Sequence, residues 1–304
     1  MKIFLIGGTG AVGRHAVDSL LGAGHELTVL ARSPDVARAL ENRGVSTSDV
    51  SIFDRTALAD AFTGMDAVVN LASAIPPMSR FMVTSAWDAN TRVRTEGSAA
   101  ISAAASDAGV SRLVQESVSM IYPDSGDAWV DENKPVDRFP IAEANLAAEA
   151  NAARFSESGG TGIVLRFGWF YGPGATHSEQ FLALARRHLC VQMGRPDTYV
   201  SSIFMPDAGA AVAAILDAPA GVYNVTDDEP LTKREYADAL ADAVSIGWRV
   251  RVPGAAALLF GNKSTSLTRS IRATNRKIRA TTHWQPQFRS AREGWLELAR
   301  LKGD

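Results

Sequence analysis

Residues 7–13 read Gly-Gly-Thr-Gly-Ala-Val-Gly and directly follow the apolar run Ile3-Phe4-Leu5-Ile6. Glycines 8, 10 and 13 fit the pattern G-x-G-x-x-G, and glycines 7, 10 and 13 fit a variant with wider first spacing. Without Cβ atoms, such a segment can turn tightly, admit a pyrophosphate to the backbone and pack a helix close to a strand. The following helix would point its first amides at the anion. The stretch therefore predicts a dinucleotide-binding turn made by Gly7, Thr9, Gly10, Ala11, Val12 and Gly13.

Short strand-like runs alternate with helical stretches beyond this turn. The pattern predicts strands over residues 3–6, 27–30, 45–53, 67–71, 112–115 and 162–167. It predicts helices between them over residues 12–21, 34–42, 55–62, 86–108 and 141–156. Strands that recur between helices indicate βαβ units and a parallel sheet covered on both faces. We therefore expect an α/β fold, a Rossmann-type doubly wound sheet.

The pattern loosens after residue 167, which predicts a second, smaller region. Residues 168–174 look like a loop, while 200–204 and 222–224 look like further strands. We expect residues 1–167 to form a nucleotide-binding core to which residues 200–225 return. Residues 168–199 and 226–304 are expected to form a mostly C-terminal substrate-binding cap.

Composition narrows the class of protein. The 304 residues carry 31 basic and 33 acidic side chains, a net charge of −2, and a single cysteine. Near-neutral charge gives no reason to expect nucleic acid or a membrane surface as a partner. One cysteine excludes a disulfide framework and a cysteine-cluster metal site, and we expect no metal. The first apolar stretch is short and runs into glycines, unlike a signal peptide, so a cytoplasmic protein is expected.

The end of the second predicted strand bears on which dinucleotide is bound. An acidic residue there hydrogen-bonds the ribose 2′-hydroxyl of NAD, whereas an arginine accommodates the 2′-phosphate of NADP. The strand ends Val29-Leu30-Ala31-Arg32-Ser33, without an acid. We therefore expect NADP(H) to be preferred, with Arg32 as its reader, and NAD(H) to remain an alternative. The simpler interpretation of Arg32 is a solvated residue before a helix.

Several ordered motifs resemble the short-chain dehydrogenase/reductase superfamily, in particular its extended or atypical NAD(P)-dependent epimerase/dehydratase members. Besides residues 7–13, the resemblance rests on residues 70–73 (Asn-Leu-Ala-Ser), 109–114, 166–167, 170–174 and 221–225. It implies a Rossmann core and a variable C-terminal substrate region. By the same resemblance, Leu71, Ala72 and Ser73 would line the ribose and diphosphate, and Ser51 and Ile52 would edge the adenine.

The chain departs from this family at the catalytic pair. Members use Tyr-x-x-x-Lys, in which the tyrosine is the general acid/base and the lysine lowers its pKa and holds the nicotinamide ribose. No tyrosine here is followed by lysine four residues later, and the matching stretch puts Ile141 and Asn145 at the two positions. The family's Ser or Thr falls on Val118. Isoleucine cannot transfer a proton, and asparagine carries no charge to shift a neighbouring pKa.

Other residues at the ends of strands five and six are candidates for a relocated site. Tyr122 is the first choice for a proton donor, with Ser117 or Ser119 orienting a carbonyl. Alternatively, the Tyr122 hydroxyl anchors a loop and the serines bond to backbone. Glu116 is either a carboxylate base or a buried acid paired with Arg94 or Arg166.

These features favour an NADP(H)-dependent oxidoreductase acting on a small carbonyl or hydroxyl substrate. The alternatives are a non-catalytic NADP(H)-binding redox sensor and a sugar-nucleotide epimerase or dehydratase. Alanine-rich segments at residues 99–108 and 142–153 predict either a homodimer contact or packing within one subunit.

Overall fold

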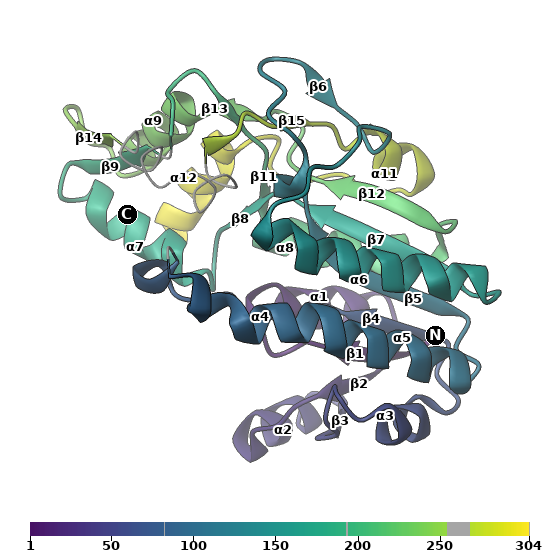
Figure 1. Cartoon of the computed structure of the whole chain (residues 1–304). Helices are drawn as coiled ribbons and strands as arrows, with labels where there is room; N and C mark the ends of the chain where they lie inside the picture. Colours follow the sequence, from purple (N-terminus) through teal and green to yellow (C-terminus); the bar gives the residue numbers. More distant parts are fainter. Residues whose placement is uncertain (82, 193, 254–267, 304) are drawn as a thin grey trace.

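The computed structural model describes residues 1–81, 83–192, 194–253 and 268–303 (Figure 1). A seven-stranded, entirely parallel sheet has the order β12-β7-β5-β4-β1-β2-β3. The strands are β1 (Lys2–Ile6), β2 (Glu26–Leu30), β3 (Ser46–Ser48), β4 (Ala67–Asn70), β5 (Arg112–Val118), β7 (Thr161–Phe167) and β12 (Gly221–Val225). This order, which reverses direction between β1 and β4, confirms the predicted doubly wound α/β fold.

Helices cover both faces of the sheet. They are α1 (Ala11–Gly22), α2 (Pro34–Glu41), α3 (Arg55–Phe62), α4 (Asp88–Arg92), α5 (Ser98–Asp107), α6 (Pro140–Glu157) and α8 (Met205–Ala214). A π-helical turn, η3 (Val93–Gly97), joins α4 to α5, so the helix predicted for residues 86–108 is continuous but locally unwound. In Figure 1, α4 and α5 run end to end as one long helix, and α6 lies beside it.

The alternation of side chains along β1 shows why both faces are buried. Ile3 and Leu5 pack into the cluster formed with α1 and α8, whereas Phe4 and Ile6 pack into the cluster formed with α3 and α5. All four side chains are at most 1% exposed. Apolar residues on both faces are the signature of a parallel strand covered by helices on each side.

The helices beyond residue 167 other than α8 divide into two groups, and the core and cap boundaries stay a prediction. Helices α7 (Thr176–Ala185), α9 (Lys233–Ala243) and α12 (Ala291–Leu301) share a buried cluster of their own, and we call this region the cap. Helix α11 (Arg276–Thr281) packs instead against β12 of the main sheet. Short strands pair outside the main sheet: β8 (Trp169–Tyr171) with β11 (Ser202–Phe204), β9 (Leu189–Gln192) with β14 (Val250–Pro253), β10 (Tyr199–Val200) with β13 (Leu231–Thr232), and β6 (Trp129–Val130) with β15 (Arg272–Ala273). Single 3₁₀ turns occupy η1 (Met78–Arg80), η2 (Thr84–Trp87), η4 (Ser119–Ile121) and η5 (Ile215–Asp217).

Some local predictions need correction. Residues 168–174 contain strand β8, because β11 pairs with it in parallel and supplies its hydrogen bonds. The strand expected over 45–53 is only β3, since the backbone leaves the sheet edge after Ser48. Residues 254–267 of the predicted cap lie outside the described residues.

The two alanine-rich helices meet within the chain. Ser102 Oγ on α5 donates to the carbonyl of Asn151 on α6 at 2.9 Å, and Asn151 Nδ2 donates to Ser98 Oγ at 2.6 Å. Intrasubunit packing therefore accounts for part of their small-residue faces, and the homodimer stays a prediction. Among the described helices, none is long and apolar enough to cross a membrane.

Candidate active site

A cavity of about 620 Å³ lies where the carboxyl ends of the central strands meet the cap. Core and cap both contribute walls. The lining residues come from the glycine turn (7, 10–13), the segment after β4 (71, 73–77, 81, 87), α4 and η3 (90, 94), β5 and η4 (116, 118, 120), α6 (141, 145) and the cap side (168–170, 174–177, 180, 205). Ligands of doubly wound sheets bind in this crevice, at the point where the strand order reverses.

The glycine turn forms one end of the cavity with an unobstructed backbone. Gly7 has φ +83°, and a Cβ there would lie 2.6 Å from the carbonyl of Leu71. A Cβ on Gly13 would collide with the carbonyl oxygen of Gly7, so α1 packs this close to the turn only with glycine. Helix α1 begins at Ala11 without a side-chain cap. Its first amides are therefore free for an anion, which fits a dinucleotide diphosphate.

Seven of the residues predicted to bind cofactor line the cavity: Gly7, Gly10, Ala11, Val12, Gly13, Leu71 and Ser73. The others lie around it. Thr9 is exposed beside the turn, and Ala72 donates its amide to Asn70 Oδ1 at 3.1 Å. Ser51 and Ile52 follow β3 and do not line the cavity. Ile52 packs instead against Gly97 of η3.

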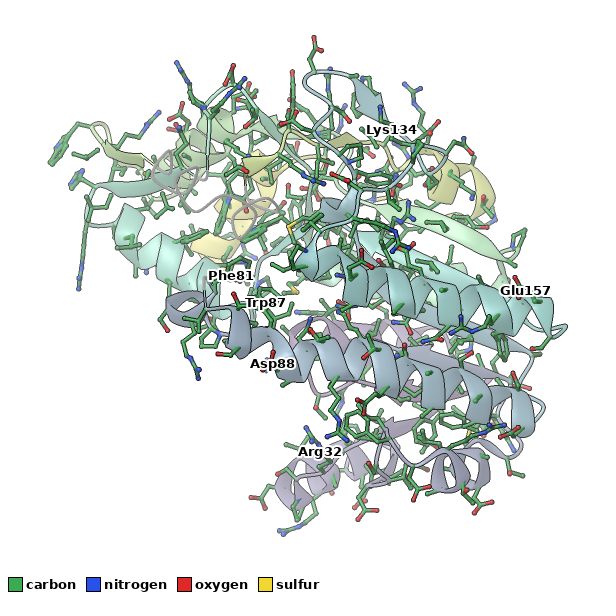
Figure 2. The ribbon with its side chains drawn as sticks, in the orientation of Figure 1. Arg32, Phe81, Trp87, Asp88, Lys134 and Glu157 are labelled. Atoms are coloured by element: carbon green, nitrogen blue, oxygen red, sulfur yellow. The ribbon has the colours of Figure 1, made fainter. Side chains whose placement is uncertain are left out.

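Arg32 stands at the carboxyl end of β2, exposed at the start of α2 (Figure 2). No carboxylate of the described residues pairs with it. Arg38, on the adjacent helix α2, differs because its guanidinium lies 3.4 Å from Asp35. An unpaired cation at this strand end is placed as a reader of a ribose phosphate would be.

One wall of the cavity is apolar and largely aromatic, with side chains from the segment after β4, from β8 and from α6. Phe81 and Trp87 contact each other edge to face with ring centroids 4.9 Å apart, and Trp87 Nε1 donates to the Phe81 carbonyl at 2.8 Å. Figure 2 shows the pair together near the start of α4. Trp169, Phe170 and Ile141 add further apolar wall. Such a chamber suits a flat, weakly polar molecule.

Two buried polar atoms of lining residues lack a partner among the described residues. Asn145, 3% exposed, donates from Nδ2 to the carbonyl of Ile141 at 3.0 Å, but its Oδ1 accepts nothing. The indole Nε1 of Trp169 is likewise unpartnered. Buried polar atoms are nearly always hydrogen-bonded, so these two atoms lack a partner that the described residues do not supply.

An ion pair between Arg94 and Glu116 forms part of the same wall. Arg94 Nη2 lies 2.9 Å from Glu116 Oε1, and the residues are 2% and 5% exposed. Burial raises the pKa of the Glu116 carboxyl, and the opposing effect of Arg94 is smaller. Of the two partners considered for Glu116 from sequence, the structure selects Arg94.

His177 is the third ionisable side chain on the lining. Its Nε2 lies 2.7 Å from the carbonyl oxygen of Phe170, and its ring contacts Trp169 edge to face. Burial lowers the pKa of the imidazole, which favours the neutral form. His177 therefore adds no charge to the chamber near neutral pH.

The three residues predicted to be catalytic are buried, and they lie at the end of β5 or just after it. Tyr122, Ser117 and Ser119 are each at most 1% exposed, and none lines the cavity. Tyr122 Oη donates to Asn224 Oδ1 and accepts from Arg166 Nη1, both at 2.9 Å. Ser117 Oγ donates to Glu149 at 2.6 Å. The Tyr122 hydroxyl thus has two partners within the chain, which fits the alternative interpretation that it anchors a loop, and the catalytic role of these three residues stays a prediction.

Sequence reasoning assigned these residues to one group because all follow the same strand. Side chains of a strand alternate between its faces, so Glu116 and Val118 face the cavity while Ser117 faces α6. The alternation could be read from the sequence. The choice between Arg94 and Arg166 as the partner of Glu116 could not, because it depends on where η3 lies relative to β5 in the folded chain.

Comparison with known proteins agrees with this geometry. The model of the NAD dependent epimerase/dehydratase family matches residues 3–225. The chain belongs to this family. Membership gives it the Rossmann core already described and indicates an enzyme that uses a nicotinamide dinucleotide.

Two relatives with similar sequences are named as oxidoreductases. A 3-diazoavenalumate denitrifying reductase of a Streptomyces species is 32% identical over 306 residues, covering 97% of this chain and 99% of that protein. A 3 beta-hydroxysteroid dehydrogenase/Delta 5-->4-isomerase of Mycobacterium tuberculosis is 26% identical over 271 residues, covering 84% and 73%.

Solved structures share the whole fold at low sequence identity. The human epimerase family protein SDR39U1, solved with NADPH, is 23% identical, covers 99% of both chains and has a TM-score of 0.83. UDP-glucose 4-epimerase of Thermus thermophilus, solved with NAD, is 23% identical, covers 100% of this chain and 99% of that one, and has a TM-score of 0.79. These likenesses establish the fold.

Proposed function

We propose that the protein is an NADP(H)-dependent oxidoreductase that transfers hydride between the nicotinamide and a small, flat, largely apolar carbonyl or hydroxyl compound. The proposal rests on one observation: the same cavity is lined both by the glycine turn and by a group of aromatic side chains. One end has the free amides that a diphosphate needs, and the other has Phe81, Trp87 and Trp169 to enclose a substrate. Names of relatives that include reductase and dehydrogenase support the reaction class.

The residues have distinct parts in this proposal. The amides of Ala11, Val12 and Gly13 bind the diphosphate, and Arg32 pairs with the 2′-phosphate of the adenine ribose. The free Oδ1 of Asn145 accepts a hydrogen bond from a nicotinamide-ribose hydroxyl, which keeps the holding role of the family's lysine without its charge. The aromatic walls exclude water from the reacting atoms. The bound nicotinamide supplies or receives the hydride.

The apolar part of the cavity favours a substrate with few hydroxyl groups. Ile141, Val118 and Phe170 offer no polar partner to ring hydroxyls, although Asn90, Thr176 and Gln180 line the cavity elsewhere. We therefore favour simple reduction or oxidation over epimerisation.

Cofactor selectivity is tested by replacing Arg32. Arg32→Ala should weaken NADPH binding by about 10-fold to 100-fold, since a hydrogen-bonded charge contributes about 1.5–3 kcal/mol. NADH binding should be almost unchanged. Arg38→Ala is the matched control, because Arg38 is exposed but paired with Asp35. Both dissociation constants can be followed by nicotinamide fluorescence, and an unchanged NADPH-to-NADH ratio for Arg32→Ala would remove Arg32 as the reader.

Turnover is tested with the wild-type protein. Oxidation of NADPH is followed by absorbance against aromatic aldehydes, ketones, quinones and diazo-substituted phenols, with aliphatic and sugar carbonyls as comparison. Turnover confined to the aromatic compounds supports the proposal. Tight NADPH binding without turnover of any compound would instead favour a redox sensor, because such a protein needs the dinucleotide site but no proton donor.

A further inference from the structure

The cavity wall contains one carboxyl group among the described residues, and it stands beside the aromatic chamber. We infer that Glu116 is the acid that protonates the substrate oxygen during reduction, held in place by Arg94. The inference rests on the proposed function, because it assigns the proton source for the same cavity. In this proposal Glu116 carries out the proton transfer that the tyrosine of the Tyr-x-x-x-Lys pair performs in other family members.

The hydrogen bonds at Glu116 leave one oxygen available. Oε1 accepts from Arg94 Nη2 at 2.9 Å, whereas no described residue donates to Oε2. Glu116 and Val118 lie on the same face of β5, and both line the cavity. A carboxyl fixed through one oxygen and open at the other can present an O–H to a substrate carbonyl.

Arg94 is itself held rigidly. Its Nη1 donates to the carbonyl oxygen of Glu116 at 3.1 Å, so the guanidinium grips side chain and backbone of one residue. The same carbonyl accepts from Gln115 Nε2 at 2.9 Å, and Asn70 Nδ2 on β4 donates to Gln115 Oε1 at 2.9 Å. Arg94 lies in η3, and π-helical turns occur often at functional sites.

Burying such a pair needs a reason beyond stability. Removing two charges from water costs more than their attraction usually returns, and apolar residues of similar volume often serve the fold as well. Here the pair occupies the wall of a cavity that otherwise has apolar and uncharged polar sides. A role in chemistry accounts for a charged pair at this position, whereas packing alone does not.

Burial, and not the neighbouring charges, favours a Glu116 carboxyl that holds its proton. Arg94 on η3 and His177 on α7 are the other ionisable side chains on the cavity lining. Behind β5, Arg166 of β7 and Glu149 of α6 pair with each other, so their charges largely cancel. Burial raises the pKa of Glu116, and Arg94 opposes this less strongly. The proton is therefore retained to higher pH than on an ordinary carboxyl group.

The proposed step balances as follows. The substrate carbonyl carbon receives the hydride of the reduced nicotinamide, forming a C–H bond as the C=O π bond breaks. The oxygen takes the proton from Glu116 Oε2, forming the alcohol and leaving the Glu116 carboxylate beside Arg94. The dinucleotide leaves oxidised, and solvent water returns a proton to Glu116 when the alcohol departs.

The test compares variants that remove the acid in two ways. Glu116→Gln keeps the shape, and the double change Glu116→Leu with Arg94→Met removes the whole pair without stranding a charge. With an aromatic carbonyl substrate, we expect kcat to fall by about 100-fold or more in both, while the dissociation constant of NADPH stays within about 3-fold. Glu157→Gln, which changes an exposed carboxyl at the end of α6, should match the wild type.

Two further readouts separate a chemical role from a structural one. In the wild type, kcat for reduction should fall as pH rises through the pKa of Glu116, because the carboxylate cannot donate a proton. This limb should vanish in Glu116→Gln. Infrared difference spectra of the unliganded protein should show a protonated-carboxyl band that titrates above the usual carboxyl range and is missing from Glu116→Gln.

Distinct results overturn the two proposals. If the wild type oxidises NADPH with an aromatic carbonyl but Glu116→Gln keeps its kcat and falling limb, Glu116 is not the acid and the oxidoreductase assignment stands. A wild-type kcat that does not depend on pH would also refute the assignment of Glu116. If the wild type turns over no carbonyl compound, the proposed function fails first.

Discussion

The two faces of β5 carry two buried sets of charged and polar groups that differ in what they can do. On the cavity face, Arg94 and Glu116 form a pair with one carboxyl oxygen unengaged. On the opposite face, the rear network consists of Ser117, Glu149, Arg166, Tyr122 and Asn224. Successive residues of one strand, Glu116 and Ser117, thus belong to different environments.

The rear network has the marks of a structural element. Arg166 donates to Glu149 from Nε at 2.9 Å and from Nη2 at 2.6 Å, a two-point contact between β7 and α6. Its Nη1 also bonds Tyr122, which reaches β12 through Asn224. Apart from Asn224 Nδ2, which is buried and lacks a partner among the described residues, these groups bond to one another, and none of the five residues lines the cavity. The difference between the two faces teaches how to interpret a buried charged group. Such a group indicates function when one of its hydrogen-bonding atoms is unpaired and lies at a cavity that a ligand can enter.

Breaking the rear network at its centre should have the largest effect on stability. Arg166→Met leaves the Glu149 carboxylate, whose side chain is only 11% exposed, without its charged partner, and the free energy of unfolding should fall by about 3–5 kcal/mol. The comparison variant is Arg138→Met, which breaks an exposed ion pair with Glu143 on the same helix. Arg138→Met should lower the free energy of unfolding by less than about 1 kcal/mol. Urea unfolding measures both, and equal losses would contradict the structural role of the rear network.

Tyr122→Phe sharpens the comparison because Tyr122 is the sequence-based candidate for proton donor. Loss of its hydroxyl leaves Asn224 and Arg166 short of one partner each, which should destabilise the protein by about 1–3 kcal/mol. Since the hydroxyl does not reach the cavity, kcat for NADPH oxidation should stay within about twofold at a temperature where the variant is folded. A large fall in kcat at unchanged stability would reverse the roles of the two faces.

Ser117→Ala should have the smallest effect of the three. The variant loses one hydrogen bond to Glu149, whose carboxylate keeps both contacts with Arg166. We expect a loss of about 1 kcal/mol and an unchanged kcat. Ser111→Ala, at the exposed start of β5, removes a bond to the carbonyl of Asp66 and should shift the melting temperature less. A kcat effect of Ser117→Ala would restore it as a substrate-orienting residue.

The features that could be predicted from the sequence differ from those that could not in how far apart the interacting residues lie in the chain. The glycine turn and the parallel order could be predicted because both follow from local rules, namely missing Cβ atoms at fixed spacing and strands alternating with helices. The replacement of the family's tyrosine and lysine by Ile141 and Asn145 stays a prediction. Strand β8 was missed because the strand that pairs with it, β11, lies about thirty residues later.

By itself the sequence determined the glycine turn and the doubly wound core, since each depends on neighbours in the chain, and it predicts that Ile141 and Asn145 replace the family's acid–base pair. Tertiary structure alone decided which face of β5 meets the cavity. Alternation separates Glu116 from Ser117 but does not say which side α6 will cover. The same packing brought Arg94 to Glu116 across 22 positions and Arg166 to Glu149 across 17. The sequence specifies which residues carry a charged side chain. Only the folded chain determines whether that side chain is buried and which residue it pairs with.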